Sequence, residues 1–250
     1  MQLIIPLIEK KQKDLEQCRF LLWLENKNIP VEQRLSFTPS MIFFIMGFND
    51  ILNLLKINPP NNKLESIITT HCEEDIEHWQ WYLNDLERLG FDLNTWGPDL
   101  PTFMKNLWAK ETTAVRQLVY HCVAYHLNYK NKLIDLVLLE VLEATFGAFI
   151  GPMVKCVQEA GLWNNLEFFG RIHHDAESAH SSGSWVENES VDNILYEFDL
   201  DDKTRLLANE MIIDLFSRFN MMFDTWYESR KVFQARPNYL TKDMHQTLDA

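Results

Sequence analysis

RIHHDAESAH, residues 171–180, is the segment from which both the fold and the chemistry of this chain can be approached. If the segment is helical, spacings of four and three residues place His173, Glu177 and His180 on one face. The same face continues toward the N-terminus through Phe169, so we expect it to be buried. Burying two imidazoles and a carboxylate is costly unless something pairs with them. A metal ion is such a partner, and two His with one carboxylate are common ligands of non-haem iron.

The composition favours a folded, helical protein. The 250 residues are enough for a substantial core, and 46% of them are hydrophobic, including 16 Phe and 8 Trp. Only 8 residues are Gly, which disfavours an all-β or turn-rich architecture.

The charge and the cysteines limit the partners and the compartment. A net charge of −13 argues against nucleic acid and against anionic membrane surfaces. The longest apolar run, near 134–150, is interrupted by three carboxylates, so we expect no membrane span. The four Cys form no C-x-x-C pair, as is usual for reduced thiols. We therefore expect a soluble, cytoplasmic protein.

Apolar residues recur with helical periodicity along most of the chain, and no pair of strands is indicated. Pro59 and Pro60 interrupt this pattern, while Gly90 and Gly161 are typical of helix C-termini. The sequence predicts a single all-α bundle domain, 1–250, in which 237–250 form a surface tail. The predicted helices are 6–25, 40–56, 63–89, 102–126, 128–160, 164–180, 191–198 and 202–233.

The predicted helix 63–89 also carries imidazole and carboxylate on an apolar side. At about 100° per residue, His71, Glu74 and His78 share that side with Ile67 and other apolar residues. Asp75 falls at its margin. The alternative interpretation is a solvated acidic face with one hydrogen-bonded histidine.

The predicted helix 128–160 is so apolar that its central carboxylates need an explanation. Glu143 shares a side with Leu139 and Phe146, whereas Glu140 lies about 60° away and is less favoured as a ligand. A buried carboxylate is expected to be protonated or paired. A salt bridge to a neighbouring helix is the alternative to metal binding.

Three predicted helices thus offer the imidazoles and carboxylates of one candidate metal site. The set is similar to carboxylate-bridged metal sites in helical bundles. It suits iron or manganese better than structural zinc because it contains no thiolate. The candidate ligands are His71, Glu74, His78, Glu143, His173, Glu177 and His180.

The helix order, the length and the late H-x3-[D/E]-x2-H motif resemble the haem-oxygenase-like diiron oxidases. The CADD-like proteins, related in fold to the TenA and PqqC families, are the most similar members. The resemblance implies a bundle of about seven to eight helices that binds two irons. Carried over, the motif falls on His173, Glu177 and His180, the single carboxylate on Glu143, and the histidine of a Glu-x6-His pair on His78.

One position departs from the family pattern. His71 stands where the family has the Glu of its Glu-x6-His pair. Either His71 itself or Glu74, one turn later, would then complete the site. The number of irons in the site, one or two, is left open.

The resemblance implies a non-haem iron oxidase or oxygenase with dioxygen as co-substrate. Its substrate would be a small amphipathic amine or acid, or the protein's own side chains, with manganese as the alternative metal. The resemblance also implies a homodimer. Two alternatives are a metal-free TenA-like hydrolase, with Cys122 or Cys156 as nucleophile, and a non-catalytic interaction protein on the same fold.

Overall fold

The computed structural model describes residues 4–91, 95–181 and 198–233, except for the side chains of 177–181 and 231–233. Within these ranges every regular element is a helix, so the chain is an all-α bundle, as predicted. The elements are α1 (Ile5–Glu16), α2 (Arg19–Leu24), α3 (Val31–Arg34), η1 (Thr38–Met41), α4 (Ile42–Leu55), α5 (Lys63–Asp75), α6 (His78–Arg88), α7 (Leu100–Leu107), η2 (Lys110–Thr112), α8 (Thr113–Tyr129), α9 (Lys132–Glu159), α10 (Arg171–Ser181) and α12 (Asp202–Phe233).

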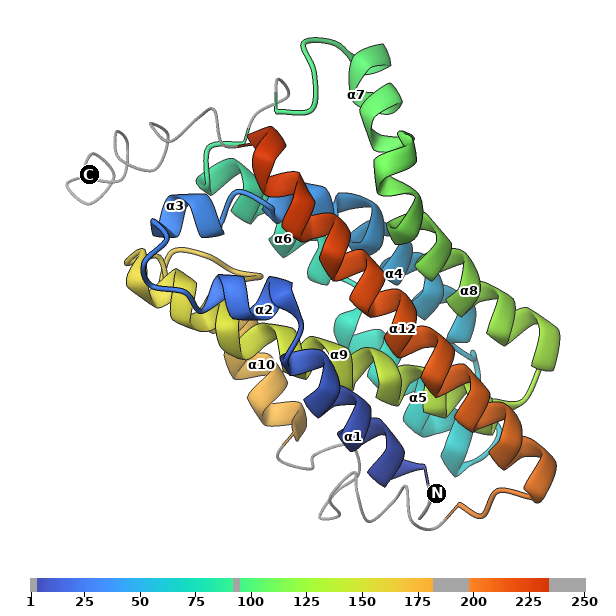
Figure 1. The fold of residues 1–250 in the computed structure, drawn as a ribbon. Coiled ribbons are helices and arrows are strands. Elements are labelled where there is room, and N and C mark those ends of the chain that lie inside the picture. Colours follow the sequence, from blue (N-terminus) through green and yellow to red (C-terminus); the bar gives the residue numbers. More distant parts are fainter. Residues whose placement is uncertain (1–3, 92–94, 182–197, 234–250) are drawn as a thin grey trace.

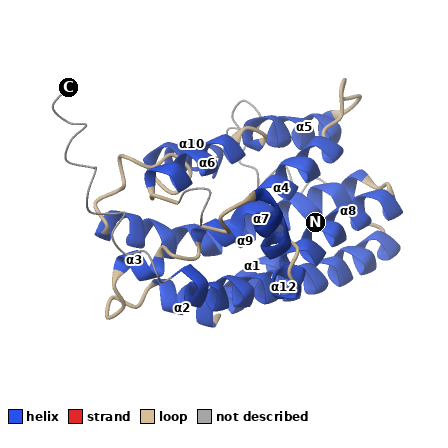
Figure 2. Cartoon of the chain, turned by 90° about the horizontal axis from the view of Figure 1, so that it is seen from above, coloured by secondary structure: helices blue, strands red, loops and turns tan. Residues whose placement is uncertain are grey.

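The long helices α9 and α12 organise the bundle. The helix α12 packs against α8 and α9, and α9 also contacts α1 and α5 (Figure 1). Figure 2 shows α5, α6 and α10 along one side and α1, α2 and α12 along the other, with α4 and α9 between them. Nearly all buried apolar side chains of the described residues form one core cluster that extends from Ile4 to Trp226.

The helix α9 is central because its sequence is apolar on nearly every side. Its start is capped by the Asn131 side chain, which accepts a hydrogen bond from the Leu133 N–H. Its end is closed by Gly161, whose φ of 72° lets the Leu162 N–H bond back to the Val157 carbonyl. This helix carries Glu143, whose side chain reaches His71 of α5.

The helices α4 and α8 approach each other closely at Gly47. A Cβ atom at this position would lie 2.6 Å from Cγ1 of Val119. Only a residue without a side chain therefore allows the two helices to pack at this separation.

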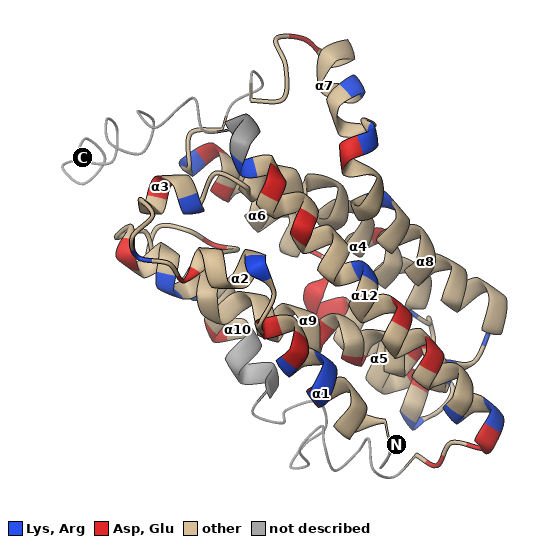
Figure 3. Ribbon diagram, in the orientation of Figure 1, with Lys and Arg blue, Asp and Glu red and all other residues tan. Residues whose placement is uncertain are grey.

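Most charged residues lie on the outside of the bundle, whereas Arg34, Asp75, Asp85 and Asp135 are buried. In the view of Figure 3, Lys and Arg are interspersed with Asp and Glu. Among the described residues, Val31–Leu55 is the one stretch long and apolar enough to cross a membrane by those two criteria. This differs from the expectation that no stretch would pass. However, 61% of its most apolar window is buried, as in a core helix of a soluble protein, so it is weak evidence for a span.

Several predicted helices are shorter in the structure than in the sequence analysis. The predicted helix 63–89 is broken at Ile76 and Glu77 into α5 and α6, and the predicted helix 164–180 begins only at Arg171. The predicted helices 6–25 and 102–126 are likewise divided. In each case the local periodicity is continuous, so it could not show where the helix would be interrupted. The predicted helix 191–198, apart from its last residue, and the predicted tail 237–250 lie outside the described residues.

Candidate metal centre

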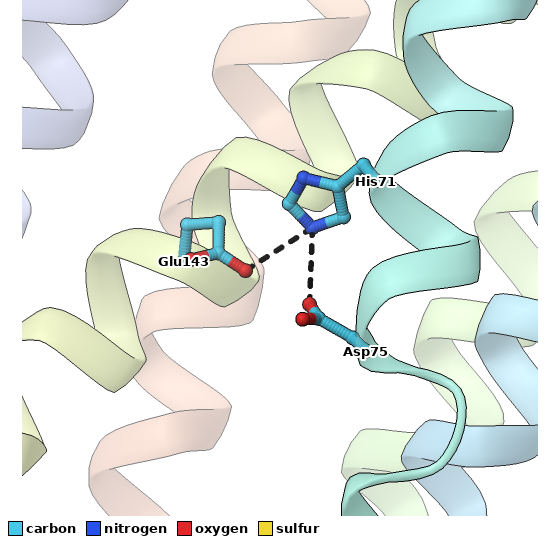
Figure 4. A group of neighbouring side chains, drawn as sticks. All are labelled: His71, Asp75 and Glu143. Carbon is cyan, nitrogen blue, oxygen red and sulfur yellow. Dashed lines mark ion pairs between the residues drawn. The ribbon is translucent and has the colours of Figure 1, made fainter. Parts of the chain in front are cut away.

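His71, Asp75 and Glu143 meet between α5 and α9 (Figure 4). The His71 Nε2 atom lies 3.1 Å from Oε1 of Glu143 and 3.5 Å from Oδ2 of Asp75. One potential ligand atom from each residue lies within 4.8 Å of the other two. Two ligands about 2.1 Å from one metal ion, at right angles, would be about 3 Å apart. The three donors are thus nearly close enough to share one ion.

The electrostatics of this cluster are set by one imidazole between carboxylates. Burial alone would lower the pKa of His71, but the hydrogen bond and charge of Glu143 raise it to about 9, helped by Asp75 and Glu140. The metal-free cluster therefore holds His71 as an imidazolium at neutral pH. A metal ion would take the place of that proton, because metal-bound His is neutral.

Asp75 joins this cluster to a second histidine. Its other oxygen, Oδ1, lies 3.6 Å from Nδ1 of His78, the first residue of α6. Asp75 is 5% exposed, so both imidazoles interact with a desolvated carboxylate. A carboxylate that faces a different His with each oxygen has the arrangement of a bridging ligand.

His173 comes from α10 and packs directly on His78. The two ring centroids are 4.4 Å apart, and the planes make an angle of 66°. The His173 Nδ1–H donates to the Phe168 carbonyl at 2.8 Å. A carbonyl only accepts, so the proton is on Nδ1 and Nε2 is left as the acceptor or ligand atom.

These polar groups line one wall of an apolar cavity of about 70 Å³. Its polar lining from α5, α6, α9 and α10 consists of Asp75, His78, Glu143, Thr145 and His173. The remaining wall is mostly aromatic and comes largely from α4, α9 and α12: Phe44, Phe48, Phe146, Phe149, Phe219, Phe223 and Trp226. The site is therefore open to a small apolar space rather than closed on all sides by protein ligands.

The structure brings together only some of the predicted site residues. His71, His78, Glu143 and His173 lie together at the cavity or beside it. Glu140 is half-buried and adds its charge to the field at His71, but Glu143 makes the contact. Glu177 and His180 belong to α10, and their side chains lie outside the described residues.

The structure places Asp75, and not Glu74, in the cluster with His71 and Glu143. Glu74 is exposed on α5 and is not part of the cluster. The helical wheel that groups Glu74 with His78 assumes one continuous helix from 63 to 89. The break at Ile76 and Glu77 resets the rotation of α6, so His78 turns toward Asp75 instead. The i, i+4 spacing of His71 and Asp75 was the available signal.

The two thiols considered as nucleophiles, Cys122 and Cys156, are buried, which disfavours that role. Burial raises the pKa of Cys122 to about 12 and that of Cys156 to about 11. The Cys156 thiol donates to the Leu24 carbonyl at 3.0 Å, within the core. Both side chains are protonated at neutral pH, and a thiol is a far weaker nucleophile than a thiolate.

Sequence comparison assigns no family to this arrangement. No protein-family model matches the chain, and the comparison with curated proteins finds no match.

Proposed function

We propose that the chain is a non-haem iron oxidase or oxygenase that acts on a small apolar or amphipathic molecule. The observation that carries this proposal is the His71–Asp75–Glu143 cluster at the wall of an aromatic cavity. Imidazole and carboxylate donors without thiolate suit iron, with manganese as the alternative. A site that only stabilised the fold would have no need of an adjoining cavity.

The donors divide into two groups that share Asp75. His71, Glu143 and one oxygen of Asp75 would hold one ion, and the other Asp75 oxygen with His78 and His173 would contribute to a second. On sequence grounds, Glu177 and His180 complete the second group. Iron bound here would supply a redox centre able to react with dioxygen. Two irons fit this division, whereas one iron would use the first group alone.

The chain's own residues provide binding and proton control around the centre. Trp81 stacks on His78 with ring centroids 4.4 Å apart, and His173 meets His78 edge-on, so the two imidazoles are shielded by aromatic contacts. The Glu143 carboxylate holds the proton of His71 until a metal replaces it. The Phe-rich wall excludes water and would hold the apolar part of a substrate. The polar wall would face its amine or acid group.

The same proposal includes the family, the cellular compartment and the oligomeric state of the protein. We propose membership of the haem-oxygenase-like diiron oxidases, a CADD-like protein, on the helix order and the motif at 173–180. A cytoplasmic homodimer goes with that membership. The metal-free hydrolase is less well supported because the pKa values of Cys122 and Cys156 are raised.

The proposal is tested by anaerobic titration with ferrous iron. We expect the wild-type protein to bind one or two irons per chain and the Asp75→Asn variant to lose iron binding. Glu74→Gln is the matched control, since it removes one negative charge from the same helix at an exposed position. Iron binding that fails in the wild type, or that is equal in all three proteins, would contradict the proposal and favour an interaction protein.

If iron binds, exposure to oxygen separates a redox enzyme from a structural metal site. We expect oxygen consumption by the iron-loaded wild type and none by Asp75→Asn. An iron-loaded wild type that consumes no oxygen, with or without added aliphatic or aromatic amines and acids, would contradict the proposed activity.

A further inference from the structure

The segment that precedes α10 is fastened to α6 by the buried carboxylate of Asp85. Its Oδ1 accepts the Glu167 backbone N–H at 2.7 Å, and its Oδ2 accepts the Phe169 backbone N–H at 2.8 Å. Asp85 is fully buried, and a carboxylate in that position is costly unless hydrogen bonds satisfy it. These two bonds replace the helical bonds that the N–H groups would make. Residues 164–170 therefore do not form the helix that the sequence predicts there.

Two further side chains of α6 hold the same segment from the outside. Arg88 Nη1 donates to the Asn165 carbonyl at 2.9 Å, and Asn84 Nδ2 donates to Glu167 Oε2 at 2.9 Å. Arg88 also pairs with the Glu167 carboxylate. These contacts are exposed to solvent, and exposed pairs contribute little. Asp85 is therefore the principal attachment.

Phe168 lies between the two residues whose N–H groups Asp85 binds, and its carbonyl orients His173. The Phe168 carbonyl accepts the Nδ1–H of His173 at 2.8 Å, while the His173 backbone N–H donates to the Glu167 carbonyl at 3.1 Å. Both acceptors lie within the three residues that Asp85 fixes. A displacement of this segment would move the carbonyl that selects the tautomer of His173.

Close backbone packing keeps the same segment in place. A Cβ atom at Gly170 would lie 2.0 Å from the Leu166 carbonyl oxygen. The chain therefore turns into α10 at a glycine, directly after the attached segment, in which Phe168 and Phe169 are both buried. The segment has little room to shift while the Asp85 bonds remain.

We infer that Asp85 is a positioning residue for His173: by binding the N–H groups of residues 167 and 169, it holds the Phe168 carbonyl against Nδ1–H of the imidazole, so that Nε2 is the atom that would bind a metal. The inference rests on the proposed function only in that His173 is taken as a metal ligand. The effect of Asp85 on the tautomer and orientation of His173 does not depend on a metal.

Asp85→Asn tests this inference because it keeps the shape but replaces one acceptor oxygen with a donor. One of the two backbone N–H groups then faces an NH₂ group. Asn84→Ala is the matched control, since it removes a contact to Glu167 from the neighbouring position on α6 and leaves both Asp85 bonds intact. Asp85→Glu keeps the charge but displaces the carboxylate oxygens, because the side chain is longer by one methylene group. This variant is used for the test if Asp85→Asn does not fold.

The first measurement is long-range ¹H–¹⁵N NMR of the imidazoles in the metal-free protein, with His173→Asn to identify the signals. We expect a single Nδ1–H tautomer for His173 in the wild type and in Asn84→Ala. In Asp85→Asn or Asp85→Glu we expect a mixture of tautomers. Signals of His173 that are unchanged in both Asp85 variants would overturn the inference, even if the variants unfold at lower denaturant.

The second measurement is ferrous affinity in the same proteins. Changes beyond the direct ligands cost metal affinity by about 10–100-fold, so we expect a loss of at least tenfold for Asp85→Asn and none for Asn84→Ala. Equal affinity in all three would also overturn the inference. If the wild type binds no iron, the proposed function fails while the NMR comparison still decides the role of Asp85.

Discussion

The Nε2 atom of His71 on α5 lies 3.1 Å from Oε1 of Glu143 on α9, inside a bundle whose core is otherwise largely apolar. The histidine is buried, whereas the side chain of Glu143 is 32% exposed and reaches the cavity. The pair thus connects a desolvated base to a carboxylate at the wall of the aromatic cavity. Its position makes proton and metal binding alternatives at the same atoms.

Replacing Glu143 should weaken metal binding much more than replacing Glu140. Glu143→Gln removes the carboxylate that contacts His71, whereas Glu140→Gln removes only a more distant charge. Changes to residues that contact metal ligands lower metal affinity by up to about 100-fold. Loss of a direct ligand should lower it by at least as much. Isothermal titration with ferrous iron or manganese under anaerobic conditions would measure both variants. The reverse order would identify Glu140 as the ligand.

Metal binding should release a proton from His71 between pH 7 and 9. Although burial opposes it, the neighbouring carboxylates raise the pKa of His71 to about 9. Since the metal binds neutral imidazole, apparent affinity should rise up to about tenfold per pH unit below that pKa. Calorimetry in buffers of different ionisation enthalpy counts the released protons. Zero proton release at pH 7.5 would mean that His71 is not a ligand.

The metal-free protein should lose stability as the pH rises from about 6.5 to about 9. His71 has a higher pKa when folded than its ordinary value of 6.5, so the folded state binds the proton more tightly. The stabilisation is fully present below pH 6.5 and is lost as the pH passes the folded pKa. A shift of this size corresponds to at most about 3 kcal/mol. Urea unfolding at several pH values, with His71→Asn expected to flatten the curve, measures it.

Gly47→Ala should destabilise the bundle because α4 and α8 touch at this residue. The new Cβ would meet Cγ1 of Val119 at 2.6 Å, and overpacking of this kind costs about 1–3 kcal/mol. Val119→Ala in the same chain removes the clashing methyl groups. Thermal unfolding should therefore show the double variant to be less destabilised than the sum of the single variants. Strict additivity would show that the helices separate instead.

The sequence was sufficient to predict the elements whose information is local. The bounds of α9 and α12 agree with the predicted 128–160 and 202–233 to within a few residues. Gly90 follows the last turn of α6 with a φ of 77°, as expected of a residue that ends a helix. Apolar periodicity and glycine conformation are properties of short stretches, so they can be detected without the fold.

The parts that could not be predicted depend on contacts between distant segments. Nothing near 164–170 indicates that Asp85 binds two of its N–H groups, so the periodicity there predicts a helix that does not form. The sequence favours Glu74 over Asp75, whereas the structure places Asp75 in the cluster because the helix breaks just after it. In both cases, tertiary hydrogen bonds or a change of helix direction override a pattern that is locally consistent.

The turn at Ile76 and Glu77 also limits how this protein can vary. Each residue added to or removed from a helix rotates the remainder of that helix by about 100°. A sequence change that made Ile76 and Glu77 helical would join α5 and α6 into one helix and fix the rotation of α6 relative to α5. His78 would then be carried away from Asp75, and Asp85 away from the segment that it holds. In evolution, residues that favour a continuous helix should therefore be selected against at these two positions.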